Sequence, residues 1–370
     1  MVFDVAIIGA GIVGAACAAR LSSAGLKVVM IEANGIASGT TAAGMGHIVV
    51  MDDSEAQFAL TRYSQQLWND LADELPPEAE FEKCGTIWVA ADEEEMAEVR
   101  RKHQYYGDQG VATEILDEQS LREAEPNLRE GLAGGLLVTG DSVVYQMFAT
   151  NFLVQKAVER GAQLRIGQRA VEITDDGVKL ENGEIVVADK IVNATGFAAA
   201  DLTPELKIVK RKGHLIVSER YPNFARHQLV ELGYLKSAHG ISTDSVAFNV
   251  QPRATGQIIL GSSRQFGATD GDIDHNILRR MTARAFEYMP KLRDLSATRV
   301  WTGFRPATPD NLPYIGQVSD RENVYVAAGH EGLGITTSLG TAALIADAIL
   351  GRKSAIPTGP YSPAREILEH

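Results

Sequence analysis

Apolar and polar positions follow two different periods over the first 32 residues. An apolar run covers Phe3–Ile8 and ends in glycines, and apolar positions then recur at helical spacing from Ile12 to Ala24. Lys27–Glu32 supplies a second short apolar run. The pattern predicts a strand, a tight turn, a helix and a second strand. Together these form one βαβ unit, which implies a parallel sheet and a right-handed crossover.

The next part of the chain predicts mainly helices. Ala56–Leu75 has helical spacing and stops at Pro76-Pro77, whereas Gly85–Ala90 has the composition of a strand. Asp92–Gly107 alternates acidic and basic residues at helical spacing, which fits a partner surface or, as we prefer, a helix face in water. Phe148–Gly161 predicts a helix that ends at glycine.

Strand patterns dominate the second half of the chain. Gln163–Gly196 predicts three short strands separated by turns that end in glycine, and the alternation from Gly213 to Ser262 predicts an antiparallel sheet. We expect a helix over Ile273–Tyr288. Asn323–Ala328 is again an apolar strand, which leads through glycines into a helix that ends near Gly351.

These elements predict an α/β protein of the two-domain α+β kind, and a length of 370 residues also favours two domains. One domain is Rossmann-like and cofactor-binding, with a parallel sheet, and the other is substrate-binding, with a mostly antiparallel sheet. The cofactor-binding domain is expected to comprise residues 1–80, 145–212 and 306–367, and the substrate-binding domain residues 81–144 and 213–305. We expect residues 368–370, Leu-Glu-His, to be the remnant of a tag.

Charge and composition narrow the classes of partner. The formal net charge is −13 and no cluster of Lys and Arg is visible, which excludes nucleic acid as a partner and requires a local cation for any anionic substrate. Two cysteines, Cys17 and Cys84, provide neither a disulfide framework nor a metal cluster, so no metal site is expected. No signal peptide is recognisable, and no apolar run reaches the roughly 18 residues of an integral membrane segment. We therefore expect a cytoplasmic protein.

The first turn carries a dinucleotide-binding pattern. Gly9, Gly11 and Gly14 form G-x-G-x-x-G between the predicted strand and helix, and Glu32 closes the next strand. Gly9 permits the tight turn, Gly11 lets a pyrophosphate approach the helix N-terminus, and Gly14 lets helix and strand pack closely. Glu32 would accept hydrogen bonds from ribose hydroxyls. A glycine turn without a ligand is the alternative, and the motif alone does not separate FAD from NAD.

Two observations favour FAD. The chain has one such fingerprint, so a second site for a nicotinamide is missing. A flavin must also be held along its whole length, and two further glycine turns after strands, Ala194-Thr195-Gly196 and Gly329–Gly334, provide backbone contacts for it.

Five motifs in order resemble a known family. They are Ser38–Met45, Ala194–Gly196, Trp301–Pro306, Thr308–Gly316 and Ala328–His330. Through them the sequence resembles the D-amino acid oxidase and glycine oxidase family of FAD-dependent flavoproteins. By overall likeness it is similar, more narrowly, to the flavin (beta) subunits of bacterial heteromeric dehydrogenases that act on proline, D-hydroxyproline and related imino acids.

The resemblance assigns residues to the cofactor. The loop from Thr40 to Gly46 would lie against the pyrophosphate and isoalloxazine, and Val171 would touch the adenine end by its backbone. The last glycine turn would place a helix N-terminus near the flavin N1–C2 carbonyl. Reduced flavin is anionic there, and a helix N-terminus stabilises negative charge. The predicted FAD-binding residues are Gly9, Gly11, Ile12, Gly14, Glu32, Ala33, Thr40, Thr41, Gly44, Met45, Gly46, Val171, Ala194, Thr195, Gly196, Gly303, Arg305, Gly332, Leu333, Gly334, Ile335 and Thr336.

The resemblance also assigns the substrate side. Arg305 matches the arginine with which the family binds a substrate carboxylate, and a planar guanidinium provides the bidentate geometry for it. Met45, Asn249 and His47 are further pocket candidates, although a packing or polar role explains His47 better, and His330 is expected to have a structural role. Glycine oxidase-like members have a tyrosine where this chain has Asn249 and a second arginine where it has Gly332. These departures disfavour glycine as the substrate and could admit a ring-shaped imino acid.

The expected activity is that of an FAD-dependent amino or imino acid dehydrogenase, with D-hydroxyproline or a related cyclic imino acid as the best candidate. Hydride transfer to flavin N5 would yield the imine, and the electrons would pass to an iron–sulfur or other electron-transfer subunit, because two cysteines cannot hold a cluster in this chain. One alternative is an oxidase that uses oxygen on glycine, sarcosine or a D-amino acid. Others are a catalytically silent flavin-binding relay subunit and a NAD-dependent dehydrogenase.

Overall fold

The computed structural model describes residues 2–233 and 244–367, so the expected tag remnant at 368–370 lies outside the described residues. Contacts between Cα atoms divide the chain into two compact units. The first unit comprises Met1–Ala79, Tyr145–Lys210 and Phe304–His370, and the second Glu80–Val144 and Arg211–Gly303. The expected domain boundary after residue 305 placed Arg305 in the substrate-binding domain, whereas its contacts group it with the first unit.

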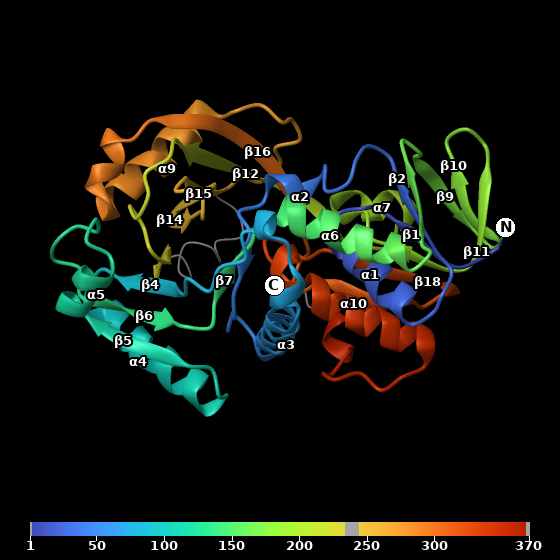
Figure 1. Cartoon of the computed structure of the whole chain (residues 1–370), viewed down its shortest axis with the longest axis horizontal. Helices are drawn as coiled ribbons and strands as arrows, with labels where there is room; N and C mark the ends of the chain where they lie inside the picture. The colour runs from blue at the N-terminus through green and yellow to red at the C-terminus, as the bar shows by residue number, and fades with distance from the viewer. Residues whose placement is uncertain (1, 234–243, 368–370) are drawn as a thin grey trace. The chain divides into compact units, whose positions relative to one another are not determined.

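A largely parallel sheet forms the centre of the first unit (Figure 1). Its strand order is β17-β18-β11-β1-β2-β8, and only β17 pairs antiparallel with its neighbour along this path. The strands are β1 (Phe3–Ile8), β2 (Val28–Glu32), β8 (Gln163–Ile166), β11 (Ile185–Asn193), β17 (Tyr314–Val318) and β18 (Arg321–Ala328). The turns that follow β1, β2, β11 and β18 therefore meet at one edge of the sheet, where ligands bind in open α/β sheets.

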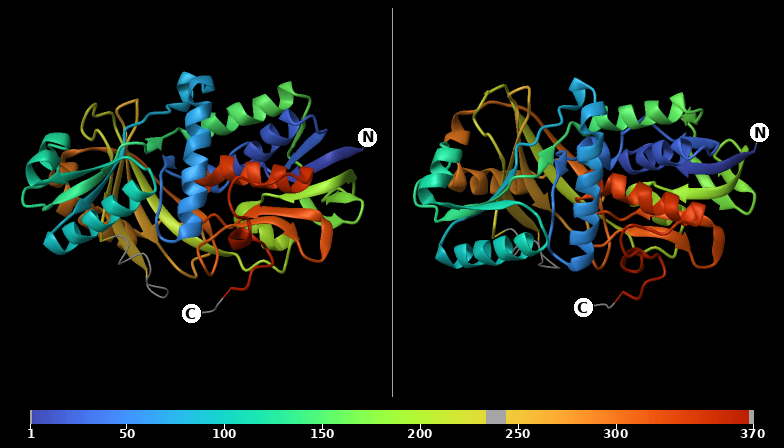
Figure 2. Two further views of the ribbon diagram at one scale, coloured as in Figure 1. Left: turned by 90° about the horizontal axis from the view of Figure 1, so that it is seen from below. Right: turned by 60° about the horizontal axis from the view of Figure 1, so that its bottom comes forward.

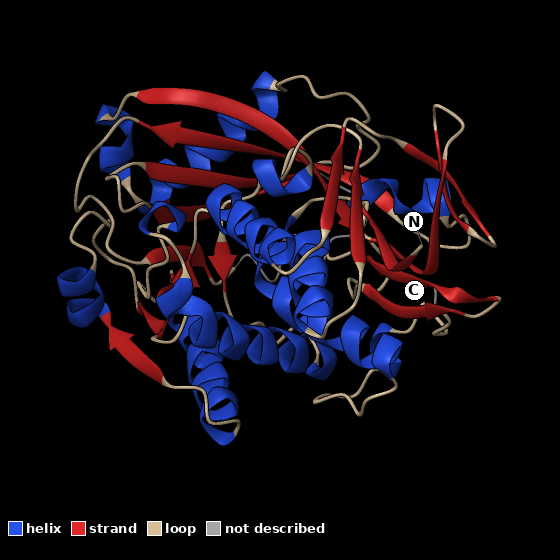
Figure 3. Ribbon diagram, turned by 45° about the vertical axis from the view of Figure 1, so that its right-hand side comes forward, coloured by secondary structure: helices blue, strands red, loops and turns tan. Residues whose placement is uncertain are grey.

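Helices pack against this sheet (Figure 3). Helix α1 contacts α6 and α10, and α10 contacts α3. The helices of the unit are α1 (Ile12–Ser23), α2 (Thr40–Ala43), α3 (Glu55–Leu71), α6 (Gln146–Glu159), α7 (Ala199–Leu202) and α10 (Gly334–Leu350). A buried apolar cluster joins the sheet to the hairpin of β9 (Ala170–Thr174) and β10 (Gly177–Leu180). The short strand β3 (His47–Ile48) completes the unit.

Two expectations about these elements were wrong in detail. Gln163–Gly196 forms four strands rather than three, because the segment before the first predicted turn is broken after Ile166 into β8, which pairs with β2, and β9, which pairs with β10. The helix expected to reach Leu75 ends at Leu71 and continues as a 3₁₀ turn over Ala72–Glu74.

The second unit is built on a mostly antiparallel sheet with the order β16-β12-β15-β14-β13-β4-β6-β5, in which the β4–β13 pair is parallel. The strands are β4 (Thr86–Ala90), β5 (Thr113–Asp117), β6 (Gly134–Val138), β12 (Val209–Ser218), β13 (Gln228–Glu231), β14 (Ser245–Pro252), β15 (Ile258–Arg264) and β16 (Ala297–Ala307), with a short β7 (Ser142–Val143) outside this sheet. The helices are α4 (Glu93–Asp108), α5 (Glu118–Ala124) and α9 (His275–Tyr288). Parallel and antiparallel sheets in separate units confirm the predicted fold class.

Among the helices of the described residues, none combines the length and apolarity needed to cross a membrane.

Candidate cofactor and substrate site

Close contacts with neighbouring atoms explain why glycine stands at each of the three motif positions of the first turn. Gly9 has φ +102°, and a Cβ there would lie 2.7 Å from the carbonyl oxygen of Ala194, while a Cβ on Gly14 would collide with the carbonyl oxygen of Gly9. A Cβ on Gly11 would lie 3.2 Å from Oγ1 of Thr41. The turn therefore lies between the end of β11 and the Thr40–Gly46 loop, which leave little room for side chains at these glycines.

Glu32 is fixed by backbone donors at the end of β2. Its Oε2 accepts from the amide of Ala10 at 2.8 Å and its Oε1 from the amide of Asn34 at 2.8 Å. An ionised carboxylate offers about four acceptor positions, so two remain after these bonds. The carboxylate is therefore held at the glycine turn and can still accept from ribose hydroxyls.

The Thr40–Gly46 loop connects the glycine turn with the end of β16. Oγ1 of Thr41 accepts from the amide of Ile12 at 3.1 Å, and Oγ1 of Thr40 donates to the carbonyl of Phe304 at 2.8 Å. These two neighbouring threonines join segments that lie far apart in the sequence. They bring the N-terminus of α1 and the residue before Arg305 to the same loop.

Further along, the same loop contacts the start of α10. A Cβ on Gly44 would lie 2.8 Å from Cδ1 of Ile335, and the carbonyl of Gly44 accepts from Nε2 of Gln146 at 2.8 Å. Met45 is buried, and Gly46 has φ +109°. The loop therefore spans from the first helix N-terminus to the last one.

The first turn of α10 has open backbone donors. Among the described residues its N-cap residue, Leu333, makes no side-chain capping bond, and N–H groups at such a helix start are suited to bind a ligand. Oγ1 of Thr336 donates to the carbonyl of His47 at 2.8 Å and accepts from the amide of Val49 at 3.4 Å.

Arg305 lies beside this turn. A Cβ on Gly332 would be 3.6 Å from Nε and 3.7 Å from Cδ of Arg305, an ordinary van der Waals separation. The guanidinium also affects His47. Burial, and to a smaller extent the positive charge of Arg305, lower the pKa of His47 to about 4. The histidine is therefore neutral at physiological pH, beside a fixed cation.

Other candidates lie elsewhere or have structural roles. Val171 lies on β9 and is 45% exposed, and the amide of Gln168, three residues before it, donates to the carbonyl of Glu32 at 3.0 Å. Asn249 lies on β14 of the second unit, and its Oδ1 is buried without a hydrogen-bond partner among the described residues. Gly303 precedes the boundary of the first unit.

The remaining cofactor candidates flank the glycine turns. Ala33 directly follows β2. Ala194 donates its amide to the carbonyl of Ile8 at 2.9 Å, and Thr195 bonds to the side chain of Asn193 at 2.7 Å. A Cβ on Gly196 would lie 3.9 Å from Oγ1 of Thr40.

Comparison with known proteins agrees with this arrangement. The model of the DAO family, described as FAD dependent oxidoreductase, matches residues 4–348. The chain belongs to this family. It is 28% identical to the glycine oxidase of Pseudomonas aeruginosa over 390 residues, which cover 98% of this chain and 99% of the relative.

Solved structures of DAO-like enzymes have the same fold. A glycine oxidase from Geobacillus kaustophilus has a TM-score of 0.89 at 26% identity, with 99% of each chain covered. An L-proline dehydrogenase from P. horikoshii has a TM-score of 0.88 at 24% identity, and the alignment covers 97% of this chain and 96% of that one. This second similarity is one of fold. The predicted family, its amino acid oxidase and dehydrogenase class, and FAD as the cofactor are confirmed.

The residues present fit FAD. The first turn admits no Cβ at Gly9 or Gly14, Glu32 retains acceptors at its end, and α10 begins with uncapped N–H groups. We expect Glu32 to hold the ribose, the first turn of α1 the pyrophosphate, and the first turn of α10 the flavin ring.

Three side chains that support this site were not predicted. Trp68 of α3 donates to carbonyls of α10, Gln146 of α6 donates to Gly44, and Asn193 donates to the carbonyl of Ala199 at 2.9 Å. No sequence motif marks them. Gln146 is the first residue of α6 and lies outside the predicted helix of Phe148–Gly161, so the helical pattern did not single it out either.

His330 has a structural role. It is buried, its Nε2 lies 2.9 Å from Oγ1 of Thr341, and burial lowers the pKa of His330 to about 3. A neutral histidine bonded within its own turn and helix fits the expected packing role.

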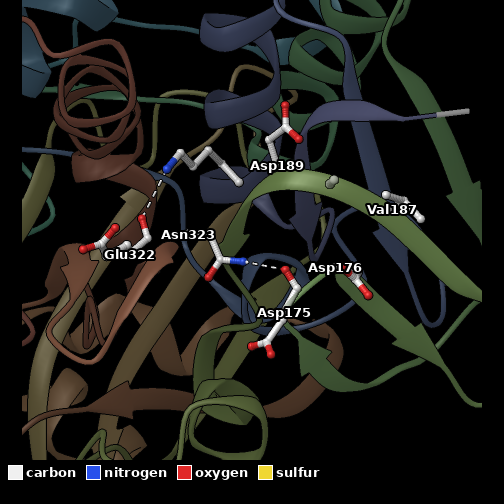
Figure 4. Close-up of a pocket in the computed structure, with 8 residues that line it drawn as sticks. Asp175, Asp176, Val187, Asp189, Glu322 and Asn323 are labelled. Atoms are coloured by element: carbon white, nitrogen blue, oxygen red, sulfur yellow. Dashed lines mark hydrogen bonds between the residues drawn. The ribbon is translucent and has the colours of Figure 1, made fainter.

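A separate hollow of about 450 Å³ lies on the first unit (Figure 4). Its walls include Asp175, Asp176, Asp189, Lys190 and Glu322, from the β9–β10 turn, the middle of β11 and the start of β18. Because the glycine turns follow the other ends of β11 and β18, this hollow is not the cofactor site.

Proposed function

We propose that this chain is a dehydrogenase that oxidises a cyclic imino acid, with D-hydroxyproline or a related proline as its substrate. The observation that carries the proposal is the pairing of Arg305 with Gly332 beside the first turn of α10. An arginine fork would hold the substrate carboxylate, and a neighbour without a side chain would leave room for a ring.

Each residue of this arrangement has a role in positioning. Arg305 would fix the carboxylate by two parallel hydrogen bonds and so orient Cα, and the neutral His47 would add no second charge beside it. The substrate loses a hydride from Cα and releases a proton from nitrogen to solvent, and the electron pair of the nitrogen forms the C=N bond of the imine. FAD, when bound, supplies the acceptor for that hydride and its electron pair.

We propose further that the electrons leave to a separate protein, such as an iron–sulfur subunit, because the chain has two cysteines and cannot hold a cluster alone. The narrower resemblance to flavin subunits of heteromeric dehydrogenases supports this reading. A cytoplasmic location is part of the same proposal.

An oxygen-using oxidase is the second candidate. The glycine oxidase relative covers nearly the whole chain, and that observation favours it. The silent relay subunit is disfavoured, because such a subunit has no need of Arg305 beside the flavin-binding turn.

One anaerobic experiment tests these readings. The purified protein is mixed with D- and L-prolines, hydroxyprolines, sarcosine, glycine and D-amino acids, and the flavin absorbance near 450 nm is followed. Bleaching by a cyclic imino acid, followed by slow reoxidation in air and rapid reoxidation by a dye, supports the dehydrogenase. Rapid peroxide release in air indicates the oxidase, and absence of bleaching by every compound indicates the relay subunit.

A further inference from the structure

Helix α3 lies against the first half of α10 (Figure 2). The contact is made close by small residues, because a Cβ on Gly340 would collide with Oγ of Ser64. One turn further along α3, this approach allows the side chain of Trp68 to reach the backbone at the start of α10.

Trp68 donates to that backbone. It is fully buried, and its Nε1 lies 3.2 Å from the carbonyl oxygen of Ile335 and 3.1 Å from that of Thr336. The carbonyl of Ile335 and the N–H of Thr336 belong to one peptide group. A donor on the oxygen polarises the peptide and strengthens its N–H as a donor.

The side chain of Thr336 also holds this turn. Its hydroxyl donates to the carbonyl of His47 and accepts from the amide of Val49. Two hydrogen-bonding groups, an indole and a hydroxyl, therefore fix the direction in which the open N–H groups of α10 point.

We propose that Trp68 is a positioning residue for the flavin, which aims the first turn of α10 at the ring and raises the reduction potential of the bound cofactor. The inference rests on the proposed function and on the expectation that this turn holds the flavin ring. A helix N-terminus stabilises negative charge, and this stabilisation falls off within the first turn, so a small displacement weakens it.

The test is Trp68→Phe in the flavin-loaded enzyme, which keeps an aromatic ring and removes the N–H. The reduction potential is measured by anaerobic equilibration with a reference dye. We expect the affinity for reduced relative to oxidised flavin to fall about fivefold, which lowers a two-electron potential by ~20 mV. The flavin dissociation constant, from titration of the apoprotein, reports binding independently of activity.

Tyr361→Phe is the matched control. Tyr361 is also buried, and its hydroxyl donates to the carbonyl of Ala56 at 2.6 Å, near the other end of α3. This variant loses a buried donor to backbone as Trp68→Phe does, so we expect a similar loss of stability with an unchanged potential. An unchanged potential in Trp68→Phe, or an equal shift in both variants, overturns the inference.

If Trp68→Phe does not retain flavin, the effect of the first turn of α10 on the reduction potential is tested with Thr336→Val. It removes the hydroxyl that holds the same turn, so the potential is expected to fall, and an unchanged potential again overturns the inference. Failure of the proposed function would give a different result. In that case no amino or imino acid would reduce the flavin of the unmodified protein, whatever its reduction potential.

Discussion

Gly332 lies beside Arg305: among the described residues other than its two chain neighbours, a Cβ at position 332 would have only the Nε and Cδ atoms of Arg305 within 4 Å. Gly332 does not have the positive φ that favours glycine, so its backbone would accept a side chain without strain. The absence of a side chain is therefore a property of the site rather than a requirement of the turn.

Gly332→Ala tests this relationship. The methyl group should fill space beside the guanidinium, and KM for cyclic imino acids should rise by about tenfold or more, since one methyl group in a pocket is worth about 1–3 kcal/mol. Sarcosine and glycine should be affected less. Steady-state kinetics on a substrate series provides the measurement, and Gly359→Ala, where a Cβ has no neighbour within 4 Å, is the control. Equal effects on small and cyclic substrates would contradict the assignment.

Arg305→Ala should raise KM by about 100-fold while flavin stays bound, because hydrogen bonds to a charged group contribute up to about 3 kcal/mol. Arg305→Lys should recover only part of this, because an ammonium lacks the planar fork. Both are measured by kinetics and by the flavin content of the purified protein. Arg165→Ala, which removes an arginine from a surface pair with Glu184, is the control. An unaltered KM for the best substrate would remove Arg305 from the substrate site.

The sequence predicted the parts of the site that depend on neighbours in the chain. Gly9 to Glu32 form one continuous βαβ unit, so the spacing alone places the acidic residue at the glycine turn. The contacts of Thr40 with Phe304 and of Trp68 with Ile335 join residues 264 and 267 positions apart. They depend on how helices and loops pack in three dimensions, which no local pattern encodes.

Gly11→Val should empty the cofactor site. A Cβ at this position is already 3.2 Å from Oγ1 of Thr41, and two further methyl groups would occupy the approach to the N-terminus of α1. We expect a colourless protein with the same secondary structure, measured by absorbance and circular dichroism. Gly107→Ala adds a Cβ where nothing lies within 4 Å and should leave the flavin content unchanged. Full flavin content in Gly11→Val would disprove the role of this turn.

Acid should destabilise the protein through its buried histidines. Burial lowers the pKa of His330 to about 3, and burial with the charge of Arg305 lowers that of His47 to about 4, whereas both titrate near 6.5 in an unfolded chain. The unfolded state binds more protons below pH 6.5, so stability that is fully present above this value is lost as pH falls through about 4 for His47 and about 3 for His330.

The free energy of unfolding by urea should therefore be lower at pH 5 than at pH 7.5. His330→Gln, which keeps a polar side chain near Thr341 but cannot titrate, should reduce this difference, although its stability at pH 7.5 is lower. His275→Gln, which replaces an exposed histidine at the start of α9, should leave the difference as it is. If His330→Gln retains the full pH dependence, the buried histidine is not its source.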